Sequence, residues 1–178
     1  LDYEEDMGEQ LEGKVLPRLY TVAVSRTRGV VGEPALVPPP VGHPPLFYPF
    51  CVGQPQLTVS ADGVPCCVFT AWELEPKRLG VIYCPVRPAH LYESTREGDE
   101  WGPPQCLTAP FFAVAHSPRV SPSGARAICL AHRNLPTTHM ACQALVLVDL
   151  ATEKYKGQLA GRSAPRVLLD EVRASAAG

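Results

Sequence analysis

Two cysteines and two histidines in the last third of the chain have the residue types and spacing of a metal site. Two residues separate Cys129 from His132, and two separate His139 from Cys142. Zinc prefers thiolate and imidazole ligands, so these four could bind it if the segment between them folded back. The alternative is that both cysteines are packed thiols on apolar strands and the histidines lie in the connecting loop. We favour the packed thiols and expect no metal ligand.

Cysteine and histidine can also form a nucleophile and its base. The sequence places no cysteine beside both a base and an oxyanion donor. His43, His90 and His116 lie beside prolines or at strand ends, where we expect loop or surface positions. We therefore predict no catalytic residue, no cofactor-binding residue and no cofactor.

A charged segment follows the first aromatic strand. Glu73 and Glu75 precede Lys77 and Arg78, and prolines bound the segment. Mixed charge of this kind is typical of a solvated, ion-paired loop. Gating of a substrate is the alternative function for this loop.

The composition limits the class of protein. The chain has 178 residues, a net charge of −2, 20 Pro and 14 Gly. Frequent Pro and Gly favour many short elements over long helices, and the low charge disfavours nucleic acid as a partner. No apolar run reaches the roughly 18 residues of a membrane span, so we expect no membrane partner. The acidic start is unlike a signal peptide and lacks an initiator Met, which favours an internal fragment.

Seven cysteines are an odd number for a disulfide framework. Adjacent Cys66 and Cys67 point to opposite faces of a strand, so a joint role is disfavoured. We predict seven free thiols in a reducing cytoplasm and no disulfide.

A repeated turn organises the predicted strands. Ser60-Ala61-Asp62-Gly63 precedes an apolar stretch, and Ser121-Pro122-Ser123-Gly124 precedes another, 61 residues later. An X-Pro pair lies a few residues upstream each time, at Pro55 and at Pro118. Units of this size built from short strands are typical of β-propeller blades, with an ordinary antiparallel sandwich as the alternative.

The apolar runs and turns predict an all-β fold with strands over most of the chain. We expect a mildly helical stretch only near the C-terminal end, from Val167 to Ala177. The strands are predicted at these ranges: 16–24, 30–37, 46–51, 64–72, 89–94, 125–131 and 144–150.

One block of sequence resembles a known family. Residues 72–84, WELEPKRLGVIYC, followed by Leu91-Tyr92, resemble the propeller of the acylaminoacyl-peptidase (acylamino-acid-releasing enzyme) family, within the prolyl oligopeptidase group of serine peptidases. Ser117 to Pro122 and Cys142 to Asp149 resemble the next blade, and the acidic stretch at residues 3–9 also looks like that propeller. The resemblance extends from about Tyr3 to about Lys156 and implies part of the N-terminal β-propeller domain only.

The resemblance implies a two-part serine peptidase whose propeller gates access to an α/β-hydrolase domain. That whole enzyme releases an N-acylated amino acid from a peptide N-terminus, and we expect it to be a homo-oligomer in the cytoplasm. Its nucleophile lies in a Gly-x-Ser-x-Gly elbow. The nearest match here, Gly161-Arg162-Ser163-Ala164-Pro165, fails at its last position. We therefore expect the chain to be inactive by itself, with its hydrolase domain as partner and acylated peptides as substrates of the whole enzyme.

The predicted fold is a partial β-propeller of two to three four-stranded antiparallel blades that do not close, since closure needs at least about four blades. A non-catalytic propeller or sandwich interaction module is the alternative. The predicted units are outer strands of a preceding blade at 1–40, one blade at 41–108, a second blade at 109–161, and an irregular or weakly helical tail at 162–178.

Overall fold

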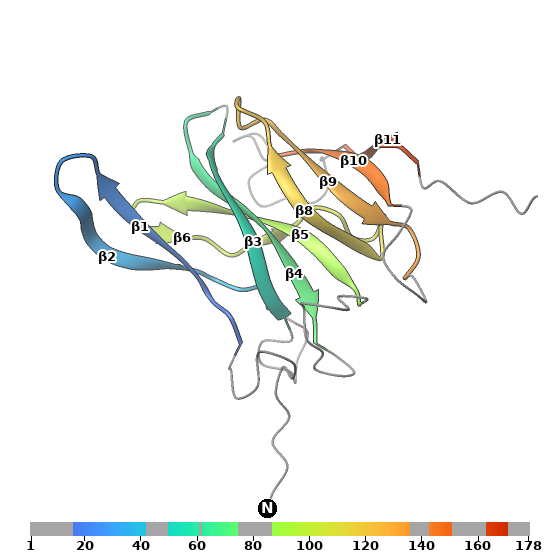
Figure 1. The fold of residues 1–178 in the computed structure, drawn as a ribbon, viewed down its shortest axis with the longest axis horizontal. Helices are drawn as coiled ribbons and strands as arrows, with labels where there is room; N and C mark the ends of the chain where they lie inside the picture. Colours follow the sequence, from blue (N-terminus) through green and yellow to red (C-terminus); the bar gives the residue numbers. More distant parts are fainter. Residues whose placement is uncertain are drawn as a thin grey trace, which may run out of the picture.

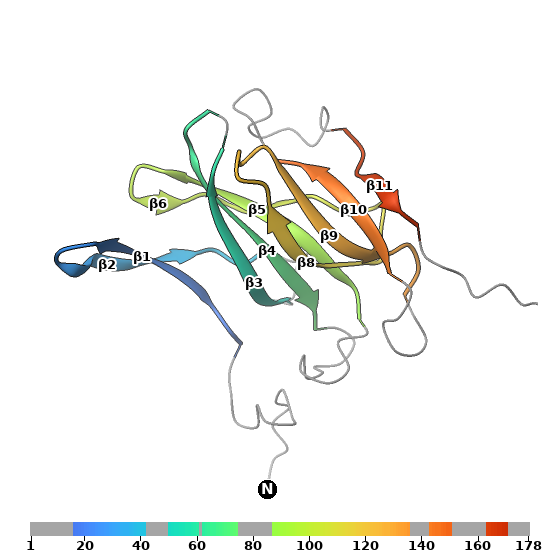
Figure 2. The same ribbon diagram turned by 45° about the horizontal axis from the view of Figure 1, so that its top comes forward.

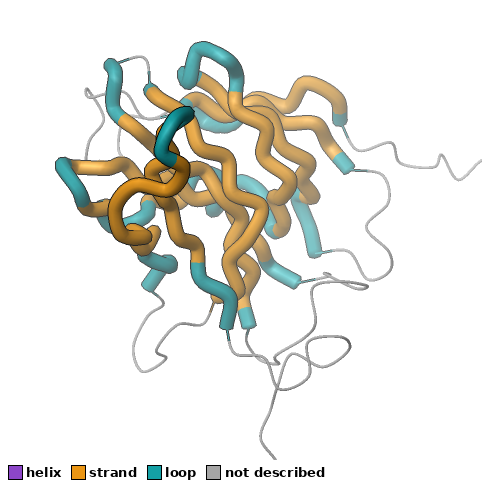
Figure 3. Tube along the Cα trace, turned by 60° about the vertical axis from the view of Figure 1, so that its left-hand side comes forward, coloured by secondary structure: helices purple, strands orange, loops and turns teal. Residues whose placement is uncertain are grey.

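The computed structural model describes residues 16–41, 50–60, 62–74, 87–135, 143–150 and 163–170. Every regular element in these ranges is a β-strand, and Figure 3 shows strands joined by short loops. This confirms the all-β prediction. No helix long and apolar enough to span a membrane occurs among these residues.

The middle of the chain forms an antiparallel meander, the first meander. Its four strands pair in chain order, and a short hairpin strand, β6 (Glu100–Trp101), extends the end of the third. The four strands are β3 (Phe50–Val59), β4 (Pro65–Glu73), β5 (Ala89–Glu97) and β7 (Gln105–Cys106).

A second meander follows with the same topology. Each strand again pairs antiparallel with the next one in the chain. Its strands are β8 (Val114–Val120), β9 (Arg126–His132), β10 (Ala144–Asp149) and β11 (Arg166–Leu169). One parallel bridge, between Ala89 and Val114, joins the two meanders.

A separate two-stranded hairpin precedes both meanders. It consists of β1 (Leu19–Ser25) and β2 (Gly29–Val37), paired antiparallel with one bulge. In Figures 1 and 2 the hairpin (blue), the first meander (teal to green) and the second meander (yellow to red) follow one another across the molecule. The described strands therefore form an open series of layers that does not close on itself.

The first meander is the central layer, because apolar side chains cover both of its faces. Val68 and Leu91 pack with the inner face of the second meander, which is rich in alanine. Phe69 packs on the opposite face with residues of the hairpin, and its ring stacks on Tyr92 at 6.1 Å between centroids. Strand β4 is consequently buried on both sides over Cys66–Trp72.

The two predicted turns have matching chemistry. The amide of Gly63 donates to the carbonyl of Ser60, and the amide of Gly124 donates to the carbonyl of Ser121. Both glycines have positive φ, 80° and 68°, which L side chains rarely adopt. Each serine hydroxyl also accepts from a nearby backbone amide, that of Val64 just before β4 or that of Arg126 at the start of β9.

Two strand predictions need correction. The short strand expected at 46–51 is longer at its end: β3 runs from Phe50 to Val59, because a bulge carries the ladder past Pro55, and residues 46–49 lie outside the described residues. The helical stretch expected from Val167 to Ala177 is wrong at its start, because β11 occupies Arg166–Leu169; residues 171–177 lie outside the described residues. An isolated helix of this length is marginal, whereas the open edge of β10 offers unpaired backbone groups and a place for Val167 against the core. The boundaries at 41–108 and 109–161 stay predictions.

Candidate functional site

The first strand of each meander contains a bulge at an X-Pro pair. The register of β3 shifts between Gly53 and Gln56, and that of β8 shifts between His116 and Arg119. Proline has no N–H to give to a ladder, so each strand bends away from its neighbour there. These bulges are the structural form of the X-Pro repeat seen in the sequence.

The residue before each proline has a left-handed backbone. Gln54 has φ of 53° and Ser117 has φ of 55°, and in the described part of the chain they alone combine positive φ with a side chain. Such a conformation costs about 1–3 kcal/mol per residue and persists only where surrounding contacts hold it. Backbone strain of this kind clusters at functional sites, so the two bulges form the candidate site.

The two strained residues bind each other across 63 residues of sequence. The backbone N–H of Ser117 donates to Gln54 Oε1 at 2.7 Å, and Gln54 Nε2 donates to Ser117 Oγ at 3.4 Å. Thr70 Oγ1 on β4 also donates to Gln54 Oε1, at 2.8 Å. The Gln54 amide therefore ties both bulges and the central strand together. Strands β3 and β8 lie side by side in Figures 1 and 2, which agrees with their contacts.

A histidine extends this polar chain. Gln143 Nε2 lies 2.7 Å from His116 Nε2, and His116 Nδ1 lies 2.9 Å from Ser117 Oγ. An amide NH₂ can only donate, so His116 Nε2 accepts and the ring carries its proton on Nδ1, which donates to Ser117. Burial, with a smaller contribution from His132, lowers the pKa of His116 and favours this neutral form.

This arrangement is suited to binding and not to nucleophilic catalysis. A serine nucleophile needs a base that accepts its proton, but His116 donates to Ser117. The assignment leaves the Ser117 hydroxyl hydrogen available to a further acceptor. Gln54 is exposed and Ser117 is half-buried, so both reach the surface beside β3 and β8. We name Thr70, Gln54, Ser117, His116 and Gln143 the bulge network.

Of the four metal ligands considered from the sequence, the structure describes Cys129 and His132, and it places these two apart. Cys129 is packed in the core between the meanders, while His132, three residues along the same strand, points to the opposite face. His139 and Cys142 lie outside the described residues. Within the described ranges, no group of three or more potential ligands comes together.

Five of the seven cysteines lie in the described ranges, and all five are free thiols. Burial raises the pKa of the Cys51 thiol, and it raises the pKa values of three others, Cys66, Cys67 and Cys129, to about 12. Cys106 is partly exposed. Cys84 and Cys142 lie outside the described residues, so the prediction of seven free thiols stays a prediction.

The loop or surface positions expected for the histidines are wrong in two cases. His90 lies within β5 and His116 within β8, and both are partly buried. His116 is in a strand because β8 continues through its bulge past Pro118, and His90 is the second residue of β5, which begins at Ala89 as predicted. His43 lies outside the described residues, as do Glu75, Lys77 and Arg78 of the charged segment.

Sequence reasoning gave no site role to any of the five members of the bulge network, His116 included. The sequence did contain a signal for Gln54 and Ser117, because each is a polar residue before a proline at the equivalent place in its unit. Their left-handed backbone depends on partners far away in sequence, which no local pattern shows.

An all-β chain of antiparallel meanders stacked in an open series is a partial, open β-propeller. A family model described as "Acylamino-acid-releasing enzyme, N-terminal domain" matches residues 1–161. The chain belongs to the acylamino-acid-releasing enzyme family and corresponds to part of its N-terminal region.

Individual relatives agree with this assignment. The chain is 32% identical to the acylamino-acid-releasing enzyme of Mus musculus over 151 residues, which is 85% of this chain. The enzymes of Rattus norvegicus and Homo sapiens are 31% and 32% identical over the same length. The chain spans 18% of the length of each of these relatives.

Proposed function

We propose that this chain is a segment of the propeller of an acylamino-acid-releasing serine peptidase, and that the propeller gates peptide access to a hydrolase domain of the same protein. The match of residues 1–161 to the N-terminal domain of that family carries the proposal. The chain has no Gly-x-Ser-x-Gly motif. His116 donates its proton to Ser117, whereas a serine nucleophile needs a base that accepts the serine proton. By itself the chain is inactive.

The bulge network supplies polar contacts for a passing peptide. The first strand of a propeller blade faces the central channel, and β3 and β8 are the first strands of their meanders. The Ser117 hydroxyl can donate to a peptide carbonyl, and the exposed Gln54 amide keeps donor capacity on Nε2. An acylated peptide N-terminus has no charge and presents amide groups, which match such neutral donors.

Activity of the isolated chain is the first test. Incubation with a chromogenic N-acylated amino acid is expected to give no release above the rate without protein. Turnover that survives purification and is blocked by a serine-directed phosphonate would contradict the assignment of an inactive propeller segment.

Gating needs a second test in an enzyme that has a catalytic part. Residues 1–161 replace the corresponding region of the Mus musculus relative, and a chimera carrying Gln54→Ala and Ser117→Ala is the matched control. We expect the first chimera to prefer short over long acylated peptides, measured as the ratio of kcat/KM values, and the control to lose part of that preference. Equal ratios for both chimeras and for the catalytic part alone would refute gating.

An interaction module without an enzyme is the second candidate. Aliphatic side chains on both outer layers are exposed, including Val24 at 69% and Leu169 at 65%. Exposed apolar surface of this kind favours a binding partner. A Gly-x-Ser-x-Gly hydrolase domain on the same transcript decides for the peptidase, and its absence decides for the module. A cytoplasmic setting and a homo-oligomeric whole enzyme belong to the peptidase proposal.

A further inference from the structure

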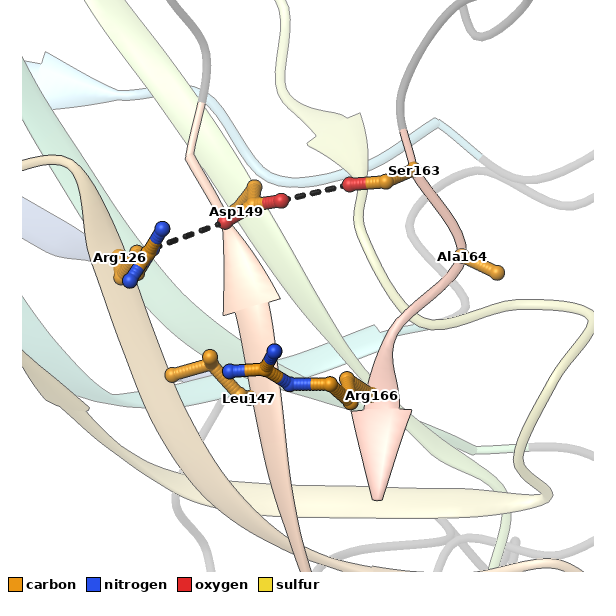
Figure 4. Close-up of a pocket in the computed structure, with 6 residues that line it drawn as sticks. All are labelled: Arg126, Leu147, Asp149, Ser163, Ala164 and Arg166. Carbon is orange, nitrogen blue, oxygen red and sulfur yellow. Dashed lines mark hydrogen bonds and ion pairs between the residues drawn. The ribbon is translucent and has the colours of Figure 1, made fainter. Parts of the chain in front are cut away.

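A hollow of about 190 Å³ lies on the second meander, on the side away from the first. Figure 4 shows side chains from β9, β10 and the segment that leads into β11 around this hollow. Its lining consists of Arg126, Leu147, Asp149, Ser163, Ala164 and Arg166. Two guanidinium groups, one carboxylate and one hydroxyl therefore share a small, open site.

Asp149 is the present partner of both polar neighbours. Arg126 Nε lies 3.2 Å from Asp149 Oδ1, and Ser163 Oγ donates to Asp149 Oδ2 at 2.6 Å. The Arg126 and Asp149 side chains are 59% and 50% exposed. An ion pair this exposed to solvent contributes little to stability, so Arg126 can exchange its partner easily.

Arg166 supplies a second cation at the same place. Its Cα pairs with that of Leu147 on β10, and Figure 4 shows its side chain extending across Leu147. With Arg126 and Arg166 against Asp149, the site has a net positive charge. Neighbouring guanidinium groups that present several N–H donors match the oxygens of a phosphate monoester.

Ser163 is placed to carry that phosphate. It is exposed and lies outside the strands, three residues before Arg166. The sequence Arg162-Ser163-Ala164-Pro165-Arg166 surrounds the hydroxyl with basic residues, which suits a protein kinase with an acidic substrate groove.

We propose that Ser163 is a phosphorylation site and that Arg126 and Arg166 bind the phosphate monoester. The kinase transfers the γ-phosphoryl group of ATP: Ser163 Oγ forms the new P–O bond, the bond from the γ-phosphorus to ADP breaks, and the hydroxyl proton passes to the base of the kinase. The phosphate carries a charge of about −1.5 to −2 and, as a dianion, cannot donate to Asp149. The phosphate repels Asp149 and replaces it as the partner of Arg126, so the segment that leads into β11 becomes linked to β9.

The test uses the full chain, ATP and a protein kinase that prefers serines flanked by arginine. We expect mass spectrometry to locate one phosphate on Ser163 and none in Ser163→Ala. The ³¹P resonance of the phosphorylated chain should titrate with a second pKa lower by about half a unit or more than in a phosphopeptide of the same local sequence, because the guanidinium groups favour the dianion. Arg126→Gln with Arg166→Gln should raise that pKa at least to the peptide value, because Asp149 remains beside the phosphate.

Three outcomes overturn the proposal. The first is a peptide that is phosphorylated while Ser163 of the chain is not. The second is a phosphate that titrates on the chain as it does on the peptide. The third concerns the source of the anion. It is the finding that inorganic phosphate at its cellular concentration shifts the arginine side-chain resonances of the unmodified chain as strongly as phosphorylation does. None of these results depends on peptidase activity, so they are independent of the proposed function.

Discussion

The turn glycine at position 124 gives the sharpest test of how the two meanders are joined. Gly124 is buried and has φ of 68°, and it lies against the last residues of β3. A β-carbon added there would overlap the carbonyl oxygen of Val59. It would lie 2.7 Å from the Val59 carbonyl carbon and 3.1 Å from Thr58 Oγ1. Gly63 occupies the equivalent turn of the first meander with φ of 80°, and a β-carbon there would contact nothing within 4 Å. The two glycines are thus a matched pair.

The difference between them can be given a magnitude. An L side chain at positive φ costs about 1–2 kcal/mol, and this applies equally to Gly63→Ala and Gly124→Ala. Gly124→Ala adds a steric cost of about 1–3 kcal/mol, because the obstructing atoms belong to backbone that cannot move aside alone. We therefore expect Gly124→Ala to lower the free energy of unfolding by about 1–3 kcal/mol more than Gly63→Ala does.

Equilibrium unfolding in urea measures this difference. Trp72 and Trp101 are buried, at 7% and 8% exposure, so their fluorescence reports unfolding. The measurement should be made at low protein concentration, because we expect the isolated layers to aggregate through their open edges. Equal destabilisation by the two substitutions would refute the close approach of the Gly124 turn to β3.

Three further predictions concern groups described above. Burial lowers the pKa of His116 below its ordinary 6.5, so the unfolded chain binds the proton more tightly than the folded chain does. The free energy of unfolding should therefore fall as the pH drops below about 6.5. Urea titrations at stepped pH measure this fall, and His116→Gln should reduce it. Under native conditions an alkylating reagent should modify Cys106 before the four buried cysteines of the described chain, as site-resolved mass spectrometry would show; equal rates in the native chain and in denaturant would contradict their burial. Leu91→Ala should lower the free energy of unfolding by about 2–5 kcal/mol, because Leu91 is fully buried between the meanders. Leu57→Ala is its control, since Leu57 is 62% exposed, and a similar loss for both would place the core elsewhere.

Local patterns were sufficient to predict most of the fold. The Ser60–Gly63 and Ser121–Gly124 turns are set by short-range hydrogen bonds and glycine conformations, so sequence alone located them and the strands that follow. The full extent of β3 was not predictable in this way. Proline at position 55 is a local strand breaker, and the ladder continues past it only because a bulge absorbs the missing donor.

The candidate site was less accessible from sequence. The X-Pro repeat was visible, but the strained backbone before each proline depends on the Gln54 amide meeting Ser117 across the two meanders. The proton position on His116 likewise depends on Gln143, 27 residues away. Chemistry that arises from contacts between units appears only when the units are assembled.

The double burial of β4 has a consequence for how this sequence can change over time. Alternate residues of one strand belong to different cores: Val68 faces the second meander and Phe69 faces the side of the hairpin. A slip of one residue in β4 would exchange the two sets and disturb both cores at once. Insertions and deletions should therefore be excluded from β4. Strand β11, where Leu168 and Leu169 are exposed, can vary in sequence and length. Members of the family should differ most in their outermost strands and share the length of this central one.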